Sequence, residues 1–303
     1  MREILAVLSG NILPIFIVAG FGYGLRRWLN VDQGGLSSVV LNVFSPALVF
    51  SSLATATISP AEMGRIGLFT VIVVIAMGLA GFLLSTLLRL SRVETVAMML
   101  VVMFANSGNY GLTLVNLRYG DNGLSRAVVY YVTATILLYT LGIFVASSGR
   151  LSWRETIARM VRLPAVYAAV AAVVVFVFRI KIPMPIMKAV EIAGAGAIPV
   201  MLVVLGMQLA DLKRGVELRL AAPAIGLRLI GGPILGVLIA SIIGLSGTSR
   251  SAAIIESSMP TAVFNIILAT EFGLPAPAVT SIVVLSTLIS PFTVSATISL
   301  LGL

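Results

Sequence analysis

Two polar segments interrupt long apolar stretches of the sequence and carry the side chains best suited to hold a ligand. Residues 105–111 read Ala-Asn-Ser-Gly-Asn-Tyr-Gly, and residues 256–261 read Glu-Ser-Ser-Met-Pro-Thr. Glycine and proline open a helix, and the helical half that follows then begins with unpaired N–H donors and a partial positive charge. Asn106 and Asn109 add neutral amides that orient a ligand without strong charge. The two segments therefore predict a binding site for a small organic anion such as a carboxylate.

Polar positions in neighbouring apolar stretches extend this predicted site. The predicted ligand-binding residues are Asn106, Ser107, Gly108, Asn109, Tyr110, Met259, Pro260, Thr261, Asn265, Asn42, Ser45 and Gln208. Each of these residues also has an ordinary structural explanation. Small residues let helices pack closely in membranes, and Asn265 suits a hydrogen bond to a neighbouring helix equally well.

Two charges lie deep inside apolar stretches. Arg228 follows Arg219 by nine residues, about 13 Å along a helix, and Glu256 follows Arg250 by six residues, about 9 Å. Intramembrane charges indicate function by default. Arg228 is expected to attract the anion and Glu256 to bind a proton or act as a counter-ion. The alternative is a purely structural bridge between the two.

Composition limits the class of protein. The chain has 303 residues, 59% of them hydrophobic and only 10% charged, with a mean hydropathy of +1.12. A soluble domain carries about a quarter charged residues, so this chain is predicted to be a polytopic helical membrane protein surrounded by the lipid bilayer. With no His and no Cys, imidazole and thiolate chemistry is excluded. We expect no enzyme, no catalytic residues, no cofactor and no nucleic acid partner; a metal ion is left open.

Ten apolar spans are predicted, with nine short connections. They cover about 4–25, 35–56, 66–88, 94–117, 123–147, 163–180, 185–210, 218–243, 250–272 and 275–301. A polar linker, 148–162, separates a first half, 1–147, from a second half, 163–303. Eleven Lys and Arg fall on the side of this linker and eight on the other, which places the linker in the cytoplasm. The chain is therefore predicted in the cell (inner) membrane with both termini outside.

The halves repeat at a nearly constant offset. The matches are Leu13-Pro14 with Leu163-Pro164, Pro46 with Pro199, and Tyr119-Gly120 with Phe272-Gly273, at offsets of 150, 153 and 153. An odd number of spans per half makes the repeat inverted, as in many secondary transporters. The 153 offset superimposes Ser107 on Pro260, so both breaks fall at one repeat position. The predicted fold is all-α, with ten transmembrane helices in two inverted five-helix repeats and crossing broken helices 4 and 9. Chance matches of common dipeptides are the alternative.

Three segments together resemble the auxin efflux carrier family in its bacterial form. They are residues 42–50, residues 104–111, and residues 259–263 running on to 271–273. The resemblance implies a fold similar to sodium/proton antiporters and bile-acid:sodium symporters. It also implies a scaffold of helices 1, 2, 6 and 7, a transport bundle of helices 3–5 and 8–10, elevator-like alternating access for organic anions, and often a homodimer. Plant members have a Pro between the two Asn of the first break; here the segment 106–109 has none.

A cation/proton antiporter or a sodium-coupled symporter on the same scaffold is the alternative function. It requires an acid inside the membrane, and Glu256 is the only candidate, because neither break contains the Asp usual in antiporters. Proton or sodium coupling is left open by the sequence.

Overall fold

The chain is built from membrane-length helices. The computed structural model describes residues 2–147, 163–210 and 218–303, which form helices and one isolated antiparallel β-bridge, between Ala105 and Thr261. Seven helical runs are long and apolar enough to cross a membrane: Leu5–Leu29, Gln33–Ala54, Pro60–Leu87, Ser107–Ala146, Met184–Ala210, Arg219–Ile243 and Ala276–Leu301. Pro164–Phe178 is a shorter apolar helix. The predicted class of polytopic helical membrane protein is confirmed. The predicted linker, 148–162, lies outside the described residues.

The first half contains helices interrupted by short π-helical turns. Its elements are α1 (Arg2–Val7), η1 (Leu8–Ile12), α2 (Leu13–Leu29), α3 (Gln33–Val39), η2 (Val40–Phe44), α4 (Ser45–Ala54), α5 (Pro60–Leu87), α6 (Arg92–Met103), η3 (Ser107–Leu112), α7 (Thr113–Leu137), η4 (Leu138–Gly142) and α8 (Ile143–Ala146).

The second half has the same character. Its elements are α10 (Pro164–Phe178), α11 (Met184–Ala195), α12 (Ala197–Ala210), α13 (Leu218–Gly226), η5 (Leu227–Gly231), α14 (Gly232–Ile243), α15 (Gly247–Ser257), α16 (Phe264–Glu271) and α17 (Ala276–Leu301).

Local sequence sets several helix starts. Ser91 and Glu94 form a reciprocal capping box that begins α6, and Ser59 caps α5. Asp32 caps α3, where the N–H groups of Gly35 and Gly34 donate to its carboxylate at 2.7 and 3.1 Å. These backbone hydrogen bonds hold the pKa of Asp32 below its usual range.

Gly120 divides the long run Ser107–Ala146 in two. Its φ of 61° and ψ of −155° lie in a region that only glycine enters readily. The kink falls between the spans predicted at 94–117 and 123–147, so one continuous helical assignment contains both.

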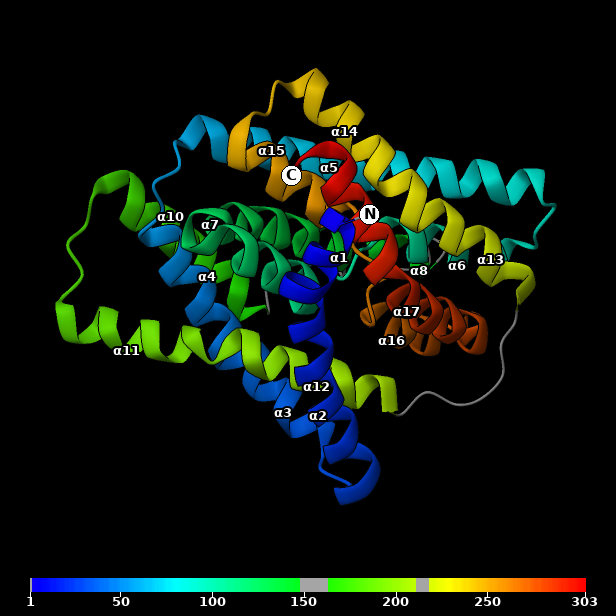
Figure 1. Ribbon diagram of the computed structural model, residues 1–303, viewed down its shortest axis with the longest axis horizontal. Coiled ribbons are helices and arrows are strands. Elements are labelled where there is room, and N and C mark those ends of the chain that lie inside the picture. The colour runs from blue at the N-terminus through cyan, green and yellow to red at the C-terminus, as the bar shows by residue number, and fades with distance from the viewer. Residues whose placement is uncertain (1, 148–162, 211–217) are drawn as a thin grey trace.

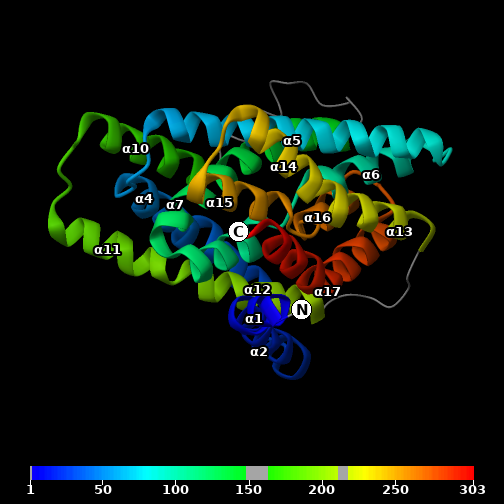
Figure 2. The same cartoon turned by 45° about the horizontal axis from the view of Figure 1, so that its top comes forward.

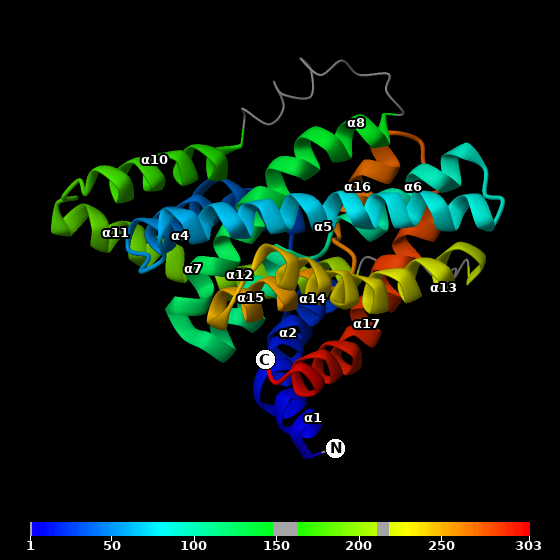
Figure 3. The ribbon, with the colours of Figure 1, turned by 90° about the horizontal axis from the view of Figure 1, so that it is seen from above.

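The helices pack in two groups. Figures 1 and 2 show α4, α10 and α11 on one flank and α13, α16 and α17 on the other. Within the first group α12 packs on α2, and α4 packs on both α10 and α11. In the second, α5 packs on α6, α7 and α14, α15 packs on α7, and α13 packs on α17. Seen from above, α5 extends across the second group beside α6 (Figure 3).

Glycines allow α2 and α12 to touch at the backbone. A Cβ at Gly22 would lie 2.0 Å from the carbonyl oxygen of Val203, and one at Gly206 would lie 1.7 Å from that of Ala19. Small residues permit such close approach in membrane proteins, where dispersion contacts drive helix association. This contact joins the start of the chain to its second half.

We expect Gly22→Ala to lower the free energy of unfolding by about 1–3 kcal/mol, because the added methyl forces the two helices apart. Thermal unfolding of the detergent-purified protein measures the change. Gly20→Ala is the matched control on the same helix, since no atom lies within 4 Å of its Cβ position. Equal melting temperatures for the two variants would contradict this account of the contact.

Candidate functional site

The two predicted breaks meet and hydrogen-bond to each other. The N–H of Asn106 donates to the carbonyl of Pro260 at 2.7 Å, and the N–H of Ala262 donates to the carbonyl of Phe104 at 2.9 Å. This is the β-bridge found in the described chain. Backbone groups freed by a helix break cannot be satisfied by lipid. Each break therefore supplies the partners that the other lacks.

Side chains reinforce the crossing. The hydroxyl of Thr261 donates to the carbonyl of Val101 at 2.9 Å, and the amide nitrogen of Asn265 donates to the carbonyl of Phe104 at 3.4 Å. Both side chains are essentially inaccessible. They hold the second break against the last turn of α6.

Arg228 neutralises the two helix ends that stop at the crossing. It comes from η5, is 1% exposed, and donates to the carbonyls of Val102 at 2.6 Å, Met259 at 3.1 Å and Ser257. These carbonyls belong to the last turns of α6 and α15 and to the residues just beyond, where the helix dipole is negative. The guanidinium thus acts as a fixed cation for the C-terminal ends, not as a group facing a ligand.

Glu256 lies nearby without a partner. Its side chain is 0% exposed, and neither carboxylate oxygen has a hydrogen-bond partner among the described residues. It packs against Gly111, where a Cβ would lie 2.2 Å from its Oε2. Within the described ranges, Arg228 and Glu256 do not form an ion pair. The structural bridge considered from sequence is therefore not formed.

A cavity of about 230 Å³ lies on one side of the crossing. Five predicted residues line it: Asn106, Ser107, Gly108, Asn109 and Gln208. Its other polar residues are Gln33, Ser37, Tyr131, Thr135 and Tyr139. No Asp, Glu, Lys or Arg is among the described residues lining it.

Both half-helix N-termini face this cavity. Ser107 to Asn109 begin η3, and Ala262 to Phe264 lead into α16, and all six residues line the cavity. Neither start is capped by a side-chain hydrogen bond. Two helix N-termini with a partial positive charge therefore face the cavity, while Arg228 contacts the two helix C-termini with a partial negative charge.

Several cavity atoms lack partners. The hydroxyl of Ser37, the amide nitrogen of Asn106 and the amide oxygen of Gln208 are buried and have no hydrogen-bond partner among the described residues. Buried polar groups are normally paired, and unpaired ones call for a ligand, an ion or water. Donors and acceptors for a polar ligand are thus present.

Seven predicted residues do not line the cavity: Asn42, Ser45, Tyr110, Met259, Pro260, Thr261 and Asn265. Met259, Pro260, Thr261 and Asn265 build the crossing itself. Ser45 lies 3.2 Å from the hydroxyl of Tyr131, which does line the cavity. The largest departure is Asn42, which is exposed and donates to the carbonyl of Ser38 in its own helix at 2.8 Å.

Sequence reasoning missed the aromatic wall. Phe104, Tyr131, Tyr139 and Phe264 line the cavity, and the rings of Tyr139 and Phe264 lie 5.2 Å apart. Part of this wall could have been identified from the sequence, because Tyr131, Thr135 and Tyr139 recur every four residues and so share one helix face. Phe104 and Phe264 had no such signal, because an apolar residue in an apolar stretch is unremarkable.

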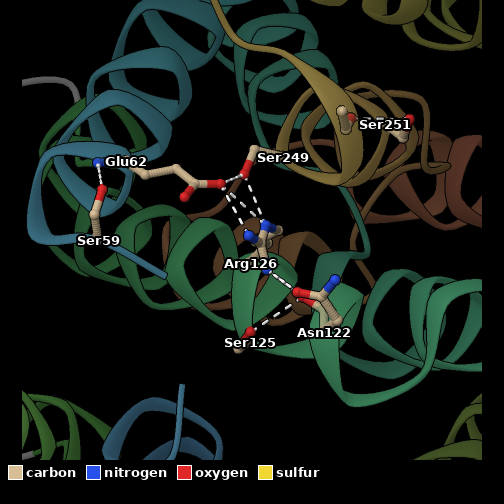
Figure 4. A network of polar contacts seen from close by, with 8 residues as sticks. Ser59, Glu62, Asn122, Ser125, Arg126, Ser249 and Ser251 are labelled. Carbon is tan, nitrogen blue, oxygen red and sulfur yellow. Dashed lines mark hydrogen bonds and ion pairs between the residues drawn. The ribbon is translucent and has the colours of Figure 1, made fainter. Parts of the chain in front are cut away.

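A second polar cluster ties three helices together at a distance from the cavity (Figure 4). Arg126 of α7 contacts Glu62 of α5 at 3.1 Å and donates to the hydroxyl of Ser249, at the start of α15, at 2.8 Å. It also donates to the carbonyl of Asn122 at 2.8 Å. These contacts hold α5, α7 and α15 as one unit.

Comparison with known proteins supports a transporter. The chain matches the family described as membrane transport protein over residues 7–155 and 149–298. It is 26% identical over 293 residues to an uncharacterized transporter of Methanothermobacter thermautotrophicus, covering 96% of this chain and 93% of that protein. An uncharacterized transporter of Methanocaldococcus jannaschii is 23% identical over 289 residues, covering 92% and 93%.

A plant protein matches one part of the chain. A probable auxin efflux carrier component 3b of Oryza sativa subsp. japonica is 26% identical over 144 residues, covering 46% of this chain and 24% of that protein. The fold and these matches define the class: a multi-pass membrane transporter and not an enzyme. The chain belongs to the membrane transport protein family of auxin efflux carrier type, as its three sequence segments indicated.

Arg228→Met is expected to destabilise the protein by about 3–5 kcal/mol, because it leaves three buried carbonyls without a donor and two helix ends unneutralised. The stability of Arg228→Lys should lie between those of Arg228→Met and the wild type, since an ammonium keeps the charge but not the planar array of guanidinium donors. Arg219→Met, at an exposed position, is the control. Thermal unfolding in detergent gives the order; an Arg228→Met protein as stable as the control would refute the capping role.

Proposed function

We propose that the protein is a secondary transporter of small organic anions, with carboxylates as the substrate class. The observation that carries the proposal is the convergence of two uncapped half-helix N-termini, at Ser107 and Phe264, on one cavity. Helix N-termini bind carboxylates through N–H donors and the helix dipole. The fully neutral lining means that the anion is held by dipoles alone, so release is not opposed by a fixed cation.

The lining also bears on the kind of carboxylate. The lining combines the two helix N-termini and the amides of Asn106, Asn109 and Gln208 with many aromatic and aliphatic side chains. A second carboxylate would find no cationic side chain among the described lining residues, at a desolvation cost. A carboxylate with an apolar or aromatic body fits this cavity better than a short dicarboxylate.

The architecture supports ten spans in two inverted five-helix repeats. The π-turn η2 covers 40–44, and the 153 offset maps it onto 193–197, where α11 ends at Ala195 and α12 begins at Ala197. The same offset relates the two breaks that hydrogen-bond to each other. The repeats would comprise residues 1–147 and 163–303, joined by 148–162.

Helix packing supports a scaffold and a moving bundle. The elements from α1 to α4 and from α10 to α12 correspond to helices 1, 2, 6 and 7. The elements from α5 to α8 and from α13 to α17 correspond to helices 3–5 and 8–10. The cavity lies between them, because Gln33 and Gln208 come from the scaffold and Asn106 and Tyr139 from the bundle. Elevator-like alternating access would move the crossing past the scaffold.

Orientation follows from the ends of the helices that line the cavity. Gln33 begins α3 and Gln208 is near the end of α12, beside the connections assigned to the cytoplasm by their Lys and Arg. The described conformation would thus face inward. Both chain ends lie close together in Figures 1 to 3, where α1 packs on α17, which fits termini on one side, outside, in the cell (inner) membrane. A homodimer, as the family resemblance implies, is part of the proposal.

We expect Asn106→Ala and Asn109→Ala each to raise the half-saturating carboxylate concentration about tenfold, the equivalent of one charged hydrogen bond. Uptake of radiolabelled aromatic and aliphatic carboxylates into proteoliposomes measures the effect. Asn42→Ala is the matched control, because that amide is exposed and outside the cavity. Wild-type uptake in both site variants, or cation/proton exchange with no carboxylate transport, would contradict the proposal.

A further inference from the structure

Glu256 is a buried acid whose charge no side chain of the described residues compensates. It lies in the last turn of α15, is 0% exposed, and has no hydrogen-bond partner among the described residues for either oxygen. An ionised carboxylate buried without a partner costs several kcal/mol. No side chain of the described residues therefore compensates an ionised Glu256, and the acid is suited to bind a proton or a cation.

The surrounding groups do not supply the missing charge. Arg228, on η5, is committed to the carbonyls of Val102, Ser257 and Met259. The other titratable groups on packed elements are Tyr110 on η3, Glu62 and Arg65 near the start of α5, Arg250 on α15 itself, and Arg118, Tyr119, Asp121, Arg126, Tyr130 and Tyr131 on α7. Among these, Tyr130 interacts electrostatically with both Arg228 and Glu256. The described lengths of α14 and α17 carry no titratable residue.

Glu256 also touches the helix that forms the proposed anion site. Its Oε2 lies 2.2 Å from where a Cβ of Gly111 would be, so the carboxyl rests directly on the backbone of η3. The first residues of η3, Ser107 to Asn109, line the cavity. A bound carboxylate and an ionised Glu256 would thus both be attracted to the same positive helix end.

We propose that Glu256 binds a proton that crosses the membrane together with the carboxylate, which makes the protein a carboxylate–proton symporter. The proposal rests on the proposed function. With the cavity empty, the ionised Glu256 is stabilised by the positive end of η3. When a carboxylate occupies that end, Glu256 takes up one proton from the same side, and both are released on the other side.

Coupling follows because the two binding events favour each other. An anion at the N-terminus of η3 repels an ionised Glu256 and so makes proton binding more favourable, and by linkage a protonated Glu256 makes anion binding tighter by the same factor. One monocarboxylate and one proton carry no net charge across. A lone carboxylate favours a proton over a metal ion, since no group of three acidic ligands occurs in the described residues; sodium is an outcome of the test.

The test measures uptake of a radiolabelled aromatic carboxylate into proteoliposomes under an imposed pH gradient, acid outside, without sodium and with the membrane potential clamped. Protein-free vesicles correct for diffusion of the neutral acid. The wild type should be stimulated at least fivefold by the gradient. Glu256→Gln should retain carboxylate exchange at equal pH but respond less than twofold.

Glu94→Gln is the matched control, because Gln preserves the capping box of α6 and the residue is remote from the cavity lining; it should keep the full stimulation. Stimulation retained in Glu256→Gln, or wild-type uptake driven by a sodium gradient and not by a pH gradient, overturns the proton site. Carboxylate uptake indifferent to both gradients overturns it too and leaves the proposed function standing. Absence of any carboxylate transport overturns both.

Infrared spectroscopy tests the same point without a variant. With saturating ¹³C-labelled carboxylate at neutral pH, the wild type should show the carbonyl band of a protonated carboxylic acid. A spectrum without that band overturns the proposal.

Discussion

The structure depends on satisfying backbone groups where two helices are broken inside a membrane protein. Lipid offers these groups no hydrogen bonds, so a break survives only where the protein supplies them. Here the two breaks supply each other: Asn106 pairs with Pro260, and Ala262 pairs with Phe104. This reciprocal pairing fixes the position of all four half-helix ends. The positions of the cavity, of Arg228 and of Glu256 all depend on this pairing.

The four half-helix ends at the crossing differ in the sign of their partial charge. Arg228 meets the carbonyls at the ends of α6 and α15, while the starts of η3 and α16 are left uncapped beside the cavity. A positive charge that neutralises the negative ends leaves the positive ends free to act on a ligand. The arrangement separates structural charge from binding charge, which is how the proposed site, with no cationic side chain among its described lining residues, would suit an anion.

The membrane-spanning character of the chain could be predicted from its composition. The two breaks could be predicted from the positions of Gly, Pro and polar residues within apolar stretches. The two breaks at 105–111 and 256–261 were predicted and do meet. The role of Arg228 was not, since a lone buried cation suggests a ligand as readily as a set of carbonyls. Asn42 was predicted at the site from its position in an interrupted span; in the described conformation it is exposed and does not line the cavity, because helix rotation is set by packing. Phe104 and Phe264 of the aromatic wall were missed because an apolar residue in an apolar stretch gives no signal of its own.

The central claim is that a carboxylate binds at the two converging helix N-termini. A structure of the protein with a brominated aromatic carboxylate tests it most directly, because anomalous scattering locates the bromine independently of the protein. We predict the carboxylate beside Ser107 to Asn109 and the bromine near Tyr139 and Phe264. Binding instead in the polar pocket between Ser51 and Glu191, or at Arg228, would contradict the account.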